Sequence, residues 1–233
     1  IILPVLLVSC KKVVQENNDN NEIASCEYGD ISISKRSPQN INELTDLIND
    51  MPKPLSIPCL IESLARPLKV NLTLSNLSAQ PAVGRTSPRI FIFFNQLVLS
   101  VAPEGKGAYL LEASFMYTDS TSLKAEYEFP INTTIEYAYP FDRIKLDVAI
   151  DGEGTTCSIC HNDEEIDNNV SVSSAYTSVA IKPESNMDLS SLRIELNNCD
   201  FHNDLTYLSL IHISEPTRRT PISYAVFCLK KFS

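Results

Sequence analysis

From residue 67 onward, apolar and polar side chains alternate along the chain with the period of two that is typical of β-strands. Runs rich in Val, Ile, Tyr and Phe recur about every ten residues and are broken by Pro, Gly, Asn or Asp, which favours short strands joined by turns. Strands are expected at residues 69–74, 89–94, 96–101, 108–117, 122–129, 134–139, 144–150, 170–181 and 189–196. The pattern predicts a mainly β domain over residues 67–207, folded as an antiparallel β-sandwich or jelly roll.

A short helical segment is expected ahead of these strands, at residues 37–66. Asn40 is followed three residues later by Glu43, which is the spacing of a capping box at a helix start. The apolar residues that follow fall on one face of a helix: Ile41, Leu44, Leu47 and Ile48. We expect this helix to end at Met51, before Pro52, and a second helical turn or two at residues 58–64.

The first ten residues, Ile1 to Cys10, are almost entirely apolar but too few to span a membrane. They are typical of the end of a signal peptide. The tetrapeptide from Leu7 to Cys10 resembles the lipobox of bacterial lipoproteins, which implies lipidation of Cys10 and stable membrane anchoring. Residues 1–9 are then a signal-peptide remnant and residues 10–36 a polar, lipidated tether. The alternative is an ordinary secretory signal followed by a chance cysteine.

The last segment, residues 208–233, resembles the in-frame translation of a transposase-type sequencing adapter. Residues 208–218 and 222–231 match its two constant halves, and residues 219–221 fall where the variable index would lie. We therefore treat this segment as a non-native tail and expect the natural sequence to break off near Tyr207. A genuine amphipathic tail is the alternative.

The net charge of the chain is −10, and the tail contributes four basic residues against one acidic residue. Without the tail the remaining residues therefore carry −13. Such an acidic protein is a poor partner for nucleic acid, whereas a basic redox protein would be attracted to it.

The sequence from Cys157 to His161 reads Cys-Ser-Ile-Cys-His, which is the attachment pattern of c-type haem. It resembles the motif of c-type cytochromes over these five residues, although not over the fold. The resemblance implies that Cys157 and Cys160 each form a thioether to haem c and that His161 ligates the iron. The motif lies in a loop between predicted strands, where a rigid β scaffold often carries function. The alternative is a disulfide between Cys157 and Cys160.

The sixth position of such a haem has two candidate ligands, Met187 and His202, and either would suit an electron carrier. An open sixth position would instead suit a sensor. The acidic residues after the motif, Asp163 to Asp167, lack the spacing and the glycine of a calcium loop. They are expected to form a solvated loop.

The remaining cysteines suggest a disulfide, since free thiols are disfavoured in an oxidising compartment. Cys26 and Cys59 are the preferred pair, which leaves Cys199 without a partner. Sequence alone does not fix this connectivity.

The first hypothesis for function is a lipid-anchored protein of the bacterial cell envelope, periplasmic or surface-facing. It carries one c-type haem for electron transfer or for sensing a redox state or ligand, with a redox protein as partner. The second is a non-haem envelope lipoprotein, a binding or structural β-sandwich in which Cys157 and Cys160 form a disulfide. An enzyme ranks only third among the hypotheses, because no acid–base pair or activated nucleophile stands out in the sequence.

Overall fold

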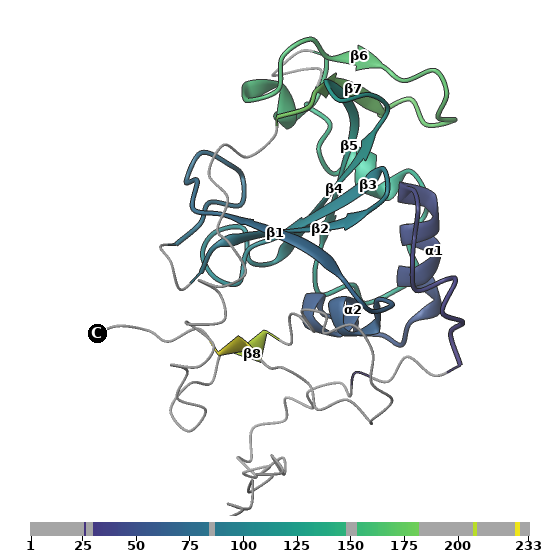
Figure 1. The fold of residues 1–233 in the computed structure, drawn as a ribbon. Helices are drawn as coiled ribbons and strands as arrows, with labels where there is room; N and C mark the ends of the chain where they lie inside the picture. Colours follow the sequence, from purple (N-terminus) through teal and green to yellow (C-terminus); the bar gives the residue numbers. More distant parts are fainter. Residues whose placement is uncertain are drawn as a thin grey trace, which may run out of the picture.

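A seven-stranded antiparallel sheet forms the centre of the structure (Figure 1). The structure is a computed structural model that describes residues 26, 30–83, 87–147 and 153–181, together with the backbones of 207–208 and 227–228. The strands of the sheet are β1 (Lys69–Thr73), β2 (Arg89–Phe94), β3 (Leu97–Val101), β4 (Leu110–Met116), β5 (Thr121–Glu128), β6 (Glu165–Ile166) and β7 (Tyr176–Val179). Their order is β1-β2-β3-β4-β5-β7-β6, so strands adjacent in sequence pair except where β7 takes the place beside β5.

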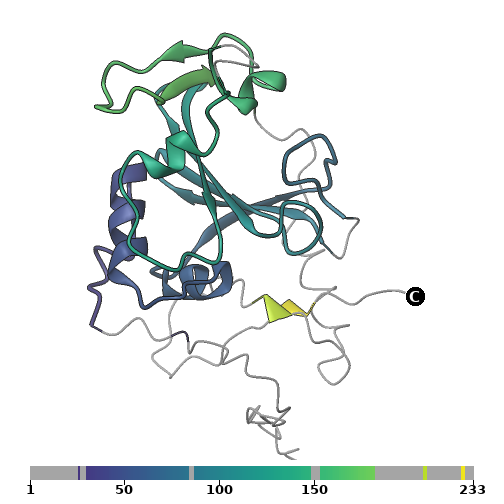
Figure 2. The same ribbon diagram turned by 180° about the vertical axis from the view of Figure 1, so that it is seen from behind.

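Two further strands, β8 (Tyr207–Leu208) and β9 (Phe227–Cys228), pair with each other outside this sheet. Within the main sheet, β7 and β6 lie at the end away from the helix α2 (Ile57–Ser63), as the views from the front and from behind both show (Figures 1 and 2).

The helical segment begins where the capping pattern predicts. In the helix α1 (Ile41–Asp50), the Oδ1 atom of Asn40 accepts a hydrogen bond from the backbone N–H of Glu43 at 2.9 Å. The Glu43 carboxylate in turn accepts one from the backbone N–H of Gln39 at 2.8 Å. The predicted helix start is therefore confirmed, and α2 begins at Ile57, capped by the side chain of Ser56. A third helix, α3 (Tyr139–Asp142), and a 3₁₀ turn, η1 (Thr156–Ile159), follow later in the chain.

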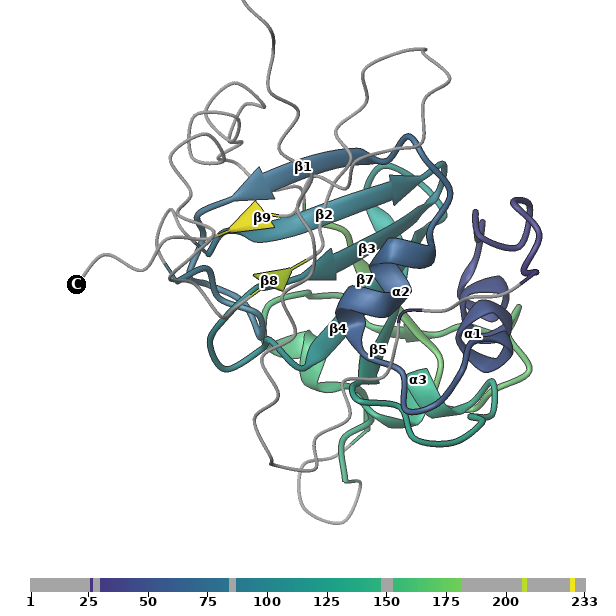
Figure 3. The same ribbon diagram turned by 90° about the horizontal axis from the view of Figure 1, so that it is seen from below.

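The core lies between one face of the sheet and the helices α1 and α2 (Figure 3). The strands alternate as expected: Ile90, Ile92 and Phe94 of β2 are buried, and the residues between them are only partly buried. The helices contribute these fully buried apolar side chains: Leu44, Leu47, Ile48, Leu60 and Ile61. The prediction of a mainly β, antiparallel domain preceded by a short helical segment is confirmed.

One predicted strand is wrong, and a tertiary contact explains why. Residues 134–138 form a loop, and residue 139 begins α3. The side chain of Asn49, on α1, donates to the backbone carbonyl of Ile135 and accepts from its N–H, both at 2.9 Å. Because a helix side chain satisfies this backbone, the segment needs no neighbouring strand. Pro140 then sits in the first turn of α3, where a missing N–H costs nothing.

Other predicted strands are shortened or lie outside the described residues. Of the strand expected at residues 170–181, only the part forming β7 is a strand. Residues 144–147, the described part of the strand expected at 144–150, do not form a strand. The strand expected at 189–196 lies outside the residues that the structure describes.

Cys26 and Cys59 are joined in a disulfide, with their Cα atoms 4.8 Å apart. This is the pair preferred from the sequence. Cys59 is buried on α2 and Cys26 packs against the core, so the bond ties the start of the described chain to a core helix.

Removing this disulfide should lower the free energy of unfolding by about 2–4 kcal/mol, because the bond closes a long loop, with a sequence separation of 33. The Cys26→Ser/Cys59→Ser variant should therefore unfold at lower urea concentration than the wild-type chain. Cys160→Ser, which removes an exposed free thiol, is the matched control and should leave the midpoint unchanged. Equal midpoints for wild type and the double variant would contradict the prediction.

Candidate functional site

The Cys-x-x-Cys-His motif folds back on itself as a tight turn built on η1. The Thr155 hydroxyl accepts a hydrogen bond from the backbone N–H of Cys157 at 3.1 Å, and its carbonyl accepts one from Ser158 Oγ at 2.8 Å. The backbone N–H groups of Cys160 and His161 both donate to the carbonyl of Cys157, at 3.1 and 2.8 Å. These bonds place both cysteines and the histidine on one short, hydrogen-bonded turn.

Glu164 holds the start of this turn in place. Its carboxylate accepts a hydrogen bond from the Thr155 backbone N–H at 2.8 Å and a short one from the Thr155 hydroxyl. Thr155 is completely buried. Gly154, with φ +122°, precedes it, and a Cβ there would lie 2.7 Å from a Glu164 oxygen. A glycine is therefore required at this position for both its backbone angle and the close approach of Glu164.

The expectation of a solvated acidic loop is wrong for Glu164 and for Asp167. Glu164 binds Thr155, as described above. Asp167 is buried and accepts hydrogen bonds from the Tyr117 hydroxyl and the Asn169 backbone N–H. These carboxylates shape the loop because they accept hydrogen bonds from Thr155, Tyr117 and Asn169, which sequence spacing alone does not reveal.

His161 is fixed by the end of β7. Its Nδ1 lies 2.7 Å from the backbone carbonyl of Val179, and the backbone N–H of Val179 donates to the carbonyl of Asn162 at 3.0 Å. Since a carbonyl only accepts, Nδ1 must carry the hydrogen, which leaves Nε2 as the nitrogen with a free lone pair. Burial lowers the pKa of His161, and the nearby Lys124 ammonium lowers it further, so the neutral imidazole is favoured at neutral pH.

The two cysteines of the motif are free thiols in different surroundings. Cys160 is exposed, whereas burial raises the pKa of the Cys157 thiol to about 11. At neutral pH Cys157 is therefore protonated, and it is a poor nucleophile. The structure does not contain the disulfide between them that the alternative hypothesis expects.

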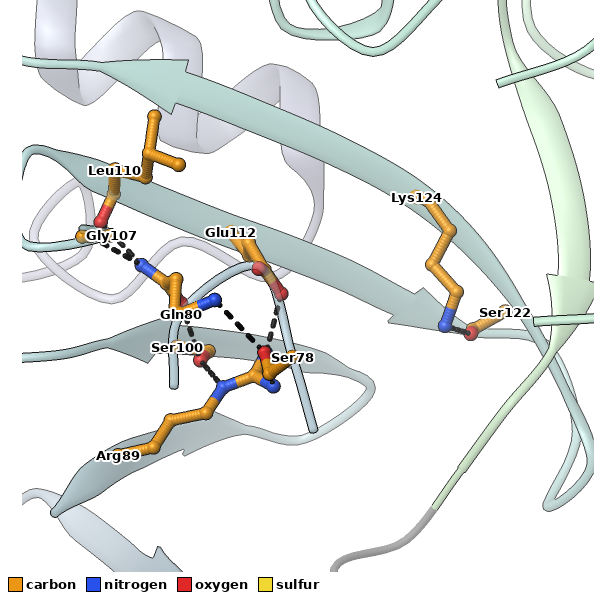
Figure 4. Close-up of polar contacts among 9 residues, drawn as sticks. All are labelled: Ser78, Gln80, Arg89, Ser100, Gly107, Leu110, Glu112, Ser122 and Lys124. Atoms are coloured by element: carbon orange, nitrogen blue, oxygen red, sulfur yellow. Dashed lines mark hydrogen bonds and ion pairs between the residues drawn. The ribbon is translucent and has the colours of Figure 1, made fainter. Parts of the chain in front are cut away.

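The face of the sheet opposite α1 and α2, which we call the polar face, carries several polar side chains and is partly covered. On it, Arg89 of β2 forms a short ion pair with Glu112 of β4 and donates to the hydroxyl of Ser100 at 2.6 Å (Figure 4). The buried side chain of Gln80, from the loop after β1, donates to the carbonyl of Leu110 at 2.6 Å. This loop therefore covers the Arg89 end of the polar face.

Lys124 lies on the same face, apart from the Arg89 group (Figure 4). Lys124 is only 7% exposed, and its Nζ donates a hydrogen bond to Ser122 Oγ at 2.7 Å. Burial lowers the pKa of Lys124 to about 8, and its charge acts on both Cys157 and His161. Sequence reasoning missed this buried lysine, whose charge acts on the Cys-x-x-Cys-His turn. The alternation of β5 does place Lys124 on the polar face, but no local signal shows that this position is buried.

Four residues singled out from the sequence, Cys10, Met187, Cys199 and His202, lie outside the residues that the structure describes. Within the described residues, no group of three or more His, Cys, Asp and Glu side chains is arranged to hold a metal ion.

Comparisons of the chain with protein-family models, with curated proteins and with solved structures gave no significant match. The geometry of the motif and of its neighbours therefore carries the functional argument.

Glu164→Ala should destabilise the motif turn, because it leaves two donors of the buried Thr155 without their acceptor. We expect a loss of about 1–3 kcal/mol in the free energy of unfolding and faster amide hydrogen exchange at Cys157 and Cys160. Glu165→Ala, which removes the neighbouring exposed carboxylate, is the control and should change neither quantity. Unchanged exchange in Glu164→Ala would show that the carboxylate does not hold the turn.

Lys124→Met should stabilise the protein at pH 7. The pKa of Lys124 falls from 10.5 to about 8 on folding, so the folded state binds fewer protons between these two values and wild-type stability rises with pH there. Below about pH 8 the cost of the buried charge is fully present. We expect a gain of about 1–3 kcal/mol at pH 7, after the loss of the Ser122 hydrogen bond is deducted, and a gain that shrinks toward pH 10.5.

Urea denaturation at pH 7 and at pH 9.5 measures this gain. Lys106→Met removes an exposed charge and is the control, which should show no such pH dependence. A Lys124→Met variant that is less stable than wild type at pH 7 would contradict the expected cost of burial.

Proposed function

We propose that this protein binds one haem c covalently through Cys157 and Cys160, with His161 as the proximal ligand of the iron. The observation that carries the proposal is the hydrogen bond from His161 Nδ1 to the Val179 carbonyl at 2.7 Å. Histidines that ligate metals almost always donate their other ring N–H to a carbonyl or carboxylate, which fixes the tautomer and the orientation of the ring. Here the bond leaves Nε2 available, and the lowered pKa keeps the ring neutral, as a ligand must be.

The other residues of the turn fit the same group. Both cysteines are free thiols, as thioether formation requires. Ile159, between them, is an apolar side chain that is 83% exposed, so the turn presents apolar surface that such a group could use. Glu164 and Thr155 order the turn before any group is attached.

When bound, haem supplies one-electron chemistry at the iron. The chain itself orients the imidazole through Val179 and places the Lys124 charge nearby. This arrangement supports electron transfer, or the sensing of a redox state or small ligand. Met187 or His202 is proposed for the sixth position.

We place the protein in the bacterial cell envelope, anchored by a lipid on Cys10. The disulfide between Cys26 and Cys59 supports an oxidising compartment, where such bonds persist. None of the helices in the described part of the chain has the length and apolar character needed to cross a bilayer. The acidic charge supports a basic redox protein as partner rather than nucleic acid.

A non-haem envelope lipoprotein is the second candidate. It is favoured by the observation that protein groups alone, Glu164 and the Val179 carbonyl, order the turn. Oxidation of Cys157 and Cys160 to a disulfide would then stiffen a loop of a binding or structural protein.

One experiment distinguishes the haem-binding function from the non-haem alternative. The full chain, exported in a bacterial host with the c-type haem maturation system, should be red, with a Soret band and a haem-stained band on a denaturing gel. Cys157→Ala/Cys160→Ala should lose the stained band, because the covalent link is gone. Ser158→Ala, within the same turn, is the control and should keep it. A colourless, unstained protein with the circular dichroism of the folded chain would exclude haem attachment and leave the second candidate.

A further inference from the structure

The buried ammonium of Lys124 uses only part of its hydrogen-bonding capacity. Its Nζ atom has three N–H donors, and it makes one hydrogen bond to the part of the chain that the structure describes, to Ser122 Oγ at 2.7 Å. Among those same residues it has no ion-pair partner within 4 Å. Glu112, an acidic residue on the same face, is already paired with Arg89.

A second polar group on this face is also unsatisfied. The residue Ser178, on β7, is 1% exposed, and its Oγ atom finds no hydrogen-bond partner within the described ranges. Ser178 is the register partner of Ser122 across β5 and β7. Directly opposed residues of antiparallel strands have Cβ atoms about 5 Å apart on one face of the sheet. The unused hydroxyl therefore lies beside the Ser122 hydroxyl that receives the Lys124 ammonium.

The chemistry of these groups selects the ligand. The ammonium can only donate, Ser122 has a hydroxyl hydrogen left to donate after accepting from Lys124, and the Ser178 hydroxyl is free to donate. A group that accepts several hydrogen bonds and carries negative charge satisfies all three. An ionised carboxylate has two oxygens with about four acceptor positions, and its hydrogen bonds to a cation are short and strong.

We propose that Lys124, Ser122 and Ser178 form a binding site for a carboxylate group. The site adjoins the Cys-x-x-Cys-His turn, because Ser178 directly precedes Val179, whose backbone carbonyl lies 2.7 Å from His161 Nδ1. Two sources of the group fit this position. One is a propionate of the haem, a source that rests on the proposed function, and the other is a free small carboxylate, which does not.

The test begins with the haem-free protein, produced without the maturation system and kept reduced. The Nζ–H signal of Lys124 is followed by ¹H–¹⁵N NMR at pH 6 while sodium propionate is added, with sodium chloride at equal ionic strength as the reference. A saturable shift with propionate, absent with chloride, is expected. Ser178→Ala should weaken propionate binding about tenfold through the loss of one hydrogen bond to a charged group.

Matched variants keep the result interpretable. Ser173→Ala removes an exposed hydroxyl just before β7 and should bind propionate as the wild type does. Lys124→Met should abolish propionate-dependent changes in the backbone amide signals of Ser122 and Ser178. No saturable shift, an equal shift with chloride, or unchanged binding in Ser178→Ala would overturn the proposal.

The haem-loaded, reduced protein then identifies the source. A Lys124 signal that is already shifted and no longer responds to added propionate would assign the site to a haem propionate. A signal that still responds with the dissociation constant of the haem-free protein would assign it to a free carboxylate. If no haem attaches, the proposed function fails while the haem-free titration still decides the carboxylate site.

Discussion

The structure depends on the two-faced alternation of its antiparallel sheet. Along β2 to β5, one set of side chains is apolar and packs against α1 and α2, while the other set faces away and includes the polar residues Arg89, Ser100, Glu112 and Lys124. Such a polar face is normally left to water. Here the loop that carries Gln80 and the segment that carries the Cys-x-x-Cys-His turn lie over parts of it, so charged groups become buried. The stable core and the unusual electrostatics of the site are consequences of the same strand pattern.

The two cations Arg89 and Lys124 on this face, one partly buried and one buried, differ in how their charge is compensated. Arg89 is neutralised by Glu112 and hydrogen-bonded to Ser100, so its desolvation is largely offset. Lys124 has the Ser122 hydroxyl as its hydrogen-bond acceptor among the described residues, and burial lowers its pKa accordingly. Burying the Lys124 charge is expected to lower stability, and an apolar side chain would pack better at this position. Ligand binding therefore explains the lysine more readily than packing does.

Sequence reasoning captured the features whose signals are local. The alternation of the strands, the capping box at Asn40 and Glu43, and the Cys-x-x-Cys-His spacing are all readable within a few residues. The strand expected at 134–139 failed because Asn49, 86 residues from Ile135, satisfies that backbone from α1. The contacts of Glu164 with Thr155 and of His161 with Val179 join positions that only the fold brings together. Sequence alone could name the motif but could not name the residues that orient it.

The partner of His161 has a further consequence for the site. A carboxylate partner would bring negative charge to the imidazole, whereas the Val179 carbonyl orients the ring without adding a charge. Burial is the main cause of the lowered pKa of His161, and the neighbouring charges of Lys124 and Arg89 lower it further. An anionic group beside Lys124 would offset the Lys124 charge and raise the basicity of the His161 imidazole. If both proposals hold, carboxylate binding at Lys124 and metal ligation by His161 would be coupled electrostatically.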